Sequence, residues 1–182
     1  MKKSMLLAAT AATLTLAAPS QLRAQVINNT TIPVIVITLF TPGTVAVPVD
    51  PAVATAVVSA SETITGNIRG IISPITGVAI PEEIARVVVA MMTSATPEVR
   101  AQVHAALSQS GASGTVVNQL MGSLPSLLSN PTPGQLQNAL SAFNGLVNNS
   151  NAAFLVNPPA EFLAIHAILL QISNAANAVP HP

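Results

Sequence analysis

The chain has 182 residues, of which 7% are charged, and it contains no cysteine, tryptophan or tyrosine. The lack of cysteine excludes disulfide bonds and a thiol nucleophile. From Gln25 onward there are three arginines and six acidic residues, a formal charge of −3, and this weakly acidic balance argues against nucleic-acid binding, which requires a basic patch.

The first 24 residues have the layout of a bacterial secretory signal peptide. Lys2 and Lys3 form a positive start, residues 5–18 carry no charge, and a polar stretch ends at Ala24. The uncharged stretch is shorter than a membrane-spanning helix requires. We therefore expect export with cleavage after Ala24, and a mature chain in the periplasm or outside the cell.

Residues 25–49 are rich in β-branched side chains and predict an extended or β-hairpin segment. Ile32–Phe40 has the length of a strand, Pro42-Gly43 fits a tight turn, and Val45–Val49 follows. A lone two-stranded hairpin is only marginally stable in water, so the segment needs a partner. That partner is either the helical part of its own chain or another subunit. In the second case we expect a homo-oligomer through residues 32–40, because an uncharged strand can add to an exposed edge.

Residues 50–182 predict a helical domain. Capping residues or prolines repeatedly precede apolar stripes with the period of a helix. The predicted helices begin at Asp50-Pro51, Pro81-Glu82-Glu83, Thr96-Pro97, Thr115, Thr132-Pro133 and Asn157-Pro158-Pro159. The stripe of the first helix runs as far as Ile71, and Pro125 interrupts the fourth. The expected fold class is mainly α, a single-domain bundle of about five or six helices preceded by the extended or hairpin segment.

The last predicted helix, residues 157–176, is apolar almost all round, with His166 and Gln171 as its main polar residues. A helix of this kind belongs at the centre of a bundle. It is too short and too interrupted to predict a membrane span, so we expect no transmembrane helix in the mature chain.

Few residues are suited to catalysis or metal binding. We expect His104 on an exposed helix surface, His166 in the core, and His181 in the terminal Pro-His-Pro. No histidine pair has the spacing of a metal site. Glu82 and Glu83 are adjacent, so on a helix they point about 100° apart, which favours a charged helix start over an ion site. The only aspartate, Asp50, is better placed as a helix cap than in a Ser-His-Asp triad. We therefore predict no enzyme, no catalytic or cofactor-binding residues, no cofactor and no metal.

Two functions fit these features. The first is an exported, non-enzymatic structural or self-assembling protein of the envelope or cell surface, because the strand-like run is uncharged and the whole chain carries little charge. The alternative is a small helical module that binds an apolar ligand or a partner helix. Its basis is the apolar helical region with Met91, Met92 and Met121, since methionine can line adaptable pockets.

Overall fold

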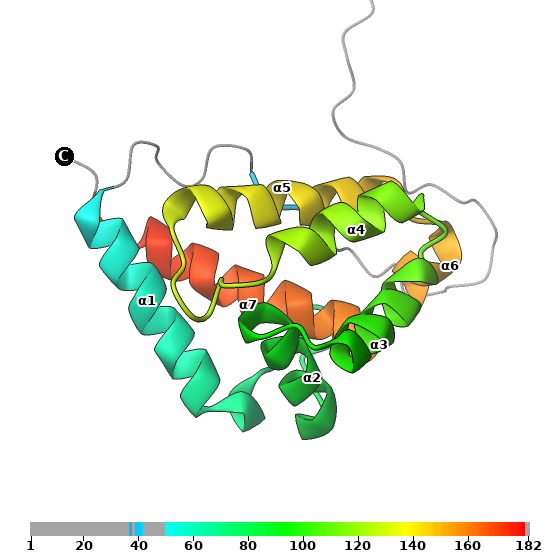
Figure 1. Ribbon diagram of the computed structural model, residues 1–182, viewed down its shortest axis with the longest axis horizontal. Coiled ribbons are helices and arrows are strands. Elements are labelled where there is room, and N and C mark those ends of the chain that lie inside the picture. Colours follow the sequence, from blue (N-terminus) through cyan, green and yellow to red (C-terminus); the bar gives the residue numbers. More distant parts are fainter. Residues whose placement is uncertain (1–36, 38, 42–49, 181–182) are drawn as a thin grey trace, which may run out of the picture. The chain divides into compact units, whose positions relative to one another are not determined.

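The computed structural model describes residues 37, 39–41 and 50–180. The predicted signal peptide (1–24), most of the predicted hairpin segment (25–49) and His181 lie outside these residues. The elements are α1 (Pro51–Gly66), the 3-10 helix η1 (Ile68–Gly70), α2 (Glu82–Thr93), α3 (Pro97–Ser108), α4 (Gly114–Ser123), α5 (Pro133–Asn148), α6 (Ala152–Val156) and α7 (Ala160–Asn177) (Figure 1). The prediction of a mainly helical bundle is confirmed, and the described part of the chain contains no β-strand.

The last helix, α7, lies at the centre of the bundle. It contacts α1, α2, α3 and α5, and Figure 1 shows it between α5 and α2. Its buried residues occupy most sides of the helix: Phe162, Ala164, Ile165, His166, Ala167, Ile168, Leu169, Ile172, Ser173 and Ala176. A narrow strip near its end, with Gln171, Asn174 and Asn177, is exposed. The prediction that this helix is central is therefore confirmed.

The predicted helix starts are confirmed to within a few residues, and two of them show the expected capping. The Asp50 carboxylate accepts a hydrogen bond from the Ala52 N–H at 2.8 Å. Thr132 and Gln135 form a reciprocal capping box at the start of α5, with N···O distances of 3.3 and 2.9 Å. These side chains bind N–H groups that have no partner within the helix.

The first helix is shorter than its apolar stripe predicted. It ends at Gly66, and Asn67 leaves the helical region with φ −133° and ψ 61°. Glycine favours such an end because it is a poor helix former. Ile71 is still buried, but it lies in a connecting loop held by an isolated antiparallel bridge between Ile72 and Ala79. The stripe identified a core residue correctly and assigned it to the wrong element.

Helix α6 was not predicted. Its N-terminus is capped by Asn151, whose side-chain oxygen accepts a hydrogen bond from the Phe154 N–H at 2.9 Å. The same side chain donates to the Ser110 carbonyl at 2.8 Å, so it also ties α6 to the α3–α4 loop. In that loop Gly111 has a φ of 72°, which favours glycine.

None of the helices in the described ranges combines the length and the apolar character needed to cross a membrane.

Candidate interaction site

The four phenylalanines of the chain and one buried histidine form a single aromatic cluster. The ring centroids lie 5.0 Å apart for Phe143–Phe162 and Phe154–Phe162, 5.1 Å for Phe143–His166, 5.4 Å for Phe40–Phe143 and 5.7 Å for Phe40–His166. Phe143 stacks nearly parallel on Phe162 and on His166, whereas Phe40 meets its two neighbours edge-on. Both arrangements are favourable for aromatic rings.

Three helices bring these rings together. Phe162 and His166 are four residues apart and therefore share one face of α7. Phe143 lies on the buried face of α5, and Phe154 is supplied by the short helix α6. The three helices thus supply four of the five rings, and Phe40 is the one ring whose residue precedes the first helix.

Asn144 holds the backbone of Phe40. The Phe40 N–H donates to the Asn144 side-chain oxygen at 2.9 Å, and the Asn144 side-chain NH₂ donates to the Phe40 carbonyl. A side-chain amide therefore pairs with both backbone groups of one residue, as a neighbouring strand would. We call Asn144, Phe143 and His166, the residues that contact Phe40, the Phe40 site.

The residues around Phe40 differ sharply in exposure. Phe40 is 6% exposed to solvent, whereas Leu39 is 42% exposed and Thr41 is also exposed. Ile37 is half-buried and packs against the core. One deeply buried side chain next to exposed ones, with the backbone paired, is the pattern by which an extended peptide is recognised: main-chain hydrogen bonds give affinity and a pocket gives specificity.

The sequence predicted neither Asn144 nor the partner of Phe40. Phe40 was expected as the last residue of a strand. The sequence does place Asn144 beside Phe143 on a predicted helix. A half-buried amide needs hydrogen-bond partners, so this asparagine was the available signal for a contact with another segment.

The two histidines that the structure describes, His104 and His166, lie where the sequence predicted them. His166 is buried within the aromatic cluster, and His104 is exposed on α3. His104 Nδ1 lies 3.3 Å from the Ser108 hydroxyl one helical turn away. This pair is on an exposed helix surface, while Glu161 accepts a hydrogen bond from Gln102 at 3.3 Å. Within the described residues, these hydrogen bonds of His104 and Glu161 do not join a serine, a histidine and an acid.

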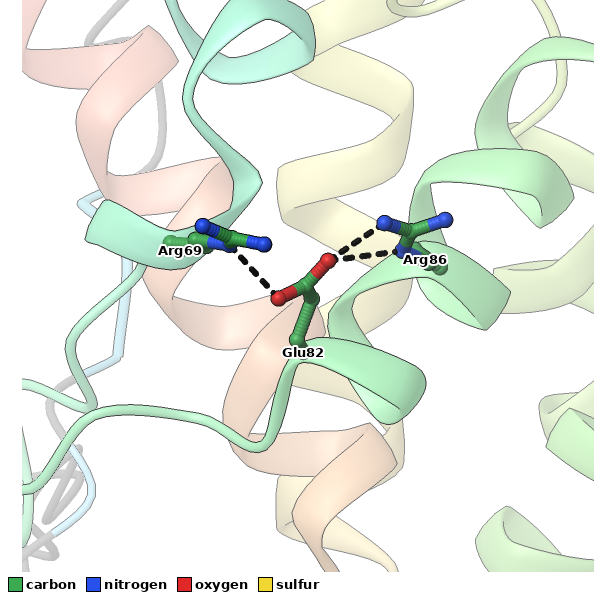
Figure 2. Close-up of polar contacts among 3 residues, drawn as sticks. All are labelled: Arg69, Glu82 and Arg86. Carbon is green, nitrogen blue, oxygen red and sulfur yellow. Dashed lines mark hydrogen bonds and ion pairs between the residues drawn. The ribbon is translucent and has the colours of Figure 1, made fainter.

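Glu82 joins two arginines on the surface (Figure 2). Its carboxylate accepts hydrogen bonds from Arg86, one turn further along α2, and from Arg69 on η1, where the N···O distance is 2.7 Å. The hydrogen bond from Arg86, and next that from Arg69, hold the pKa of Glu82 below its ordinary value. All three side chains are open to solvent, so the network adds little stability. The Glu82 carboxylate does offset part of the positive charge of Arg69 and Arg86.

Two surface depressions provide no chemistry of their own. One, of about 370 Å³, is lined by residues of α1 and of the turn before α5, and the other, of about 430 Å³, lies between α4 and α5. Neither is lined by a titratable side chain among the described residues. That part of the chain also contains no group of three or more His, Cys, Asp or Glu residues able to hold a metal ion.

The methionines that suggested an adaptable pocket belong to the core. Met91, Met92 and Met121 are all buried, with 2% exposure or less. Packing of the interior explains their presence.

The chain matches no known family model, and no curated protein or solved structure matches it significantly.

Proposed function

We propose that this chain is an exported, non-enzymatic structural protein that assembles with copies of itself at the envelope or cell surface, through residues 32–40. The observation that carries the proposal is the binding of Phe40 by Asn144 and the aromatic cluster. It provides the helical domain with a site that holds the ring and both backbone groups of Phe40. The run 32–40 has no charged residue to oppose association.

The composition supports the same proposal. With 7% charged residues in the chain, against about 25% in typical soluble domains, copies repel one another weakly. Low repulsion favours assembly when molecules are held at high local density.

The alternative, a small helical module for an apolar ligand or a partner helix, has less support. Its motivating methionines are buried in the core. The larger depression is lined by amides, hydroxyls, a glycine and a proline, whereas sites for apolar ligands are lined mainly by hydrophobic and aromatic side chains.

Self-assembly is tested by the mass of the native protein. The chain from Gln25 onward is measured by light scattering over a concentration series, beside a variant that lacks residues 26–47. We expect oligomers of the longer chain and a monomeric deletion variant. A longer chain that stays monomeric over the whole series contradicts the proposal.

Export is tested separately. N-terminal sequencing of the protein recovered from the periplasm or the medium is expected to begin at Gln25. Protein that keeps residues 1–24 and stays in the cytosol contradicts this part of the proposal.

A further inference from the structure

The contacts at the Phe40 site join two parts of the chain that are far apart in sequence. Asn144 follows Phe40 by 104 residues, and the segment around Phe40 is connected to α1 through residues 42–49 alone. One part is a short peptide and the other is a folded surface. The same peptide supplied by another molecule can make the same contacts, which is the condition for exchange of an element between identical subunits.

We propose that the Phe40 site binds residues 39–41 of a second copy, so that neighbouring subunits exchange this segment. This inference rests on the proposed self-assembly and names the acceptor surface for it. The donor contributes the Phe40 side chain and its backbone N–H and carbonyl. The acceptor contributes the Asn144 amide together with the Phe143 and His166 rings.

The connection is long enough for exchange. Ten residue steps separate Phe40 from Asp50, and an extended chain covers at most about 3.5 Å per step, or about 35 Å in total. A folded unit the size of residues 50–180 has a radius of gyration of about 14 Å, which corresponds to a sphere about 36 Å across. The reach is therefore comparable with the diameter of one subunit, so the segment can extend to a copy that adjoins it.

Exchange competes with binding of the segment to its own subunit. A short connection gives the segment an effective concentration in the millimolar range at its own site. Wild-type subunits should therefore exchange segments only at high local concentration. This competition should disappear in a mixture of two variants. In one, the segment binds its own subunit weakly, and in the other, the acceptor site is vacant.

Complementation between two variants tests the inference directly. Phe40→Ala removes the donor ring and keeps the acceptor, whereas Asn144→Ala weakens the acceptor and keeps the donor. Both are made in the chain from Gln25 onward and measured by light scattering, alone and mixed in equal amounts. We expect each to be monomeric alone and the mixture to form a 1:1 heterodimer, about tenfold tighter or more than the wild-type association, because neither copy satisfies itself.

A matched control excludes trivial effects. Asn138→Ala changes an exposed asparagine on the same helix, outside the Phe40 site. This variant should assemble like the wild type. Circular dichroism checks that every variant is folded, and Phe40→Leu replaces Phe40→Ala if the latter does not fold.

A labelled peptide of residues 32–44 provides a second measurement. It should bind the Phe40→Ala chain at least about tenfold more tightly than the wild type, whose own segment occupies the site, and the same peptide carrying Phe40→Ala should not bind.

The outcomes separate the two proposals. If the wild type assembles and both variants assemble equally well alone, self-assembly stands and the exchange is refuted, because another surface is used. A mixture of the variants that remains monomeric, or a peptide that fails to bind the Phe40→Ala chain, also refutes the exchange. A wild type that is monomeric at every concentration refutes self-assembly, and with it this inference.

Discussion

The centre of the aromatic cluster should be the most sensitive position in the chain. Phe143 is fully buried, stacks on Phe162 and His166, and meets Phe40 edge-on. Replacing a buried phenylalanine with alanine costs about 3–5 kcal/mol through lost burial and the cavity that is left. Three ring contacts, which can each add about 0.5–1.5 kcal/mol, place Phe143→Ala near the upper end, at about 4–5 kcal/mol.

Urea unfolding followed by far-ultraviolet circular dichroism measures this loss. With a slope of about 2 kcal/mol per molar urea, the midpoint should fall by about 2 M. Total stabilities of single domains are about 5–15 kcal/mol, so the variant should keep its fold only if the wild type is well above the lower limit.

Two comparisons show whether the cluster is responsible. Phe143→Leu keeps most of the apolar volume but loses all three ring contacts, so it should cost at least about 1.5 kcal/mol and less than Phe143→Ala. A double-mutant cycle of Phe143→Ala with Phe40→Ala should give a coupling of about 0.5–1.5 kcal/mol. A loss below about 2 kcal/mol for Phe143→Ala, or a coupling of zero, would refute the reasoning, because the rings would then contribute no more than ordinary apolar side chains.

Four further substitutions test other features, each by thermal or urea unfolding. Gly111→Ala should destabilise the fold by about 1–2 kcal/mol, because φ is positive there and the new Cβ would lie 2.8 Å from the Asn151 side-chain nitrogen. Gly122 lies in a helix with open space around it, so Gly122→Ala should instead stabilise the fold by about 0.5 kcal/mol. Equal effects of the two substitutions on stability would contradict both expectations. Thr132→Ala should cost about 1 kcal/mol through loss of the capping box of α5, and no change would show that this helix start is held by packing alone. Because two arginines lower the pKa of Glu82, its ion pairs stabilise the fold above its ordinary pKa and are lost as the pH falls through the lowered pKa. Glu82→Gln should therefore lower the melting temperature slightly at neutral pH, and its difference from the wild type should shrink as the pH falls below the ordinary pKa; a difference that does not shrink would contradict this.

Most of the helical fold could be predicted from the sequence because its signals are local. Proline and capping residues mark the helix starts, and the apolar pattern of residues 157–176 indicates the central helix without any knowledge of its neighbours. The predicted end of the first helix was wrong because Ile71 continues the apolar spacing while Gly66 and Asn67 end the helix. An apolar stripe reports burial, and a residue can be buried from a loop as well as from a helix.

The candidate site could not be predicted because it depends on contacts between residues far apart in the chain. Phe40 fits the end of a strand as well as it fits a pocket, and the apolar run that precedes it does not distinguish the two. Asn144 is one of many asparagines, and only its distance from the Phe40 backbone identifies it. The sequence left open whether the segment packs on its own chain or on another subunit. In the structure Phe40 packs on its own helical domain, and the predicted hairpin itself lies outside the described residues.

The concentration of every phenylalanine in one cluster, in a chain without tryptophan or tyrosine, has a practical consequence. The near-ultraviolet spectrum of this protein originates from this one location, free of the indole and phenol bands that obscure phenylalanine elsewhere. Its fine structure is therefore a label-free optical reporter of whether the Phe40 ring is seated, readable in the native protein without an added dye.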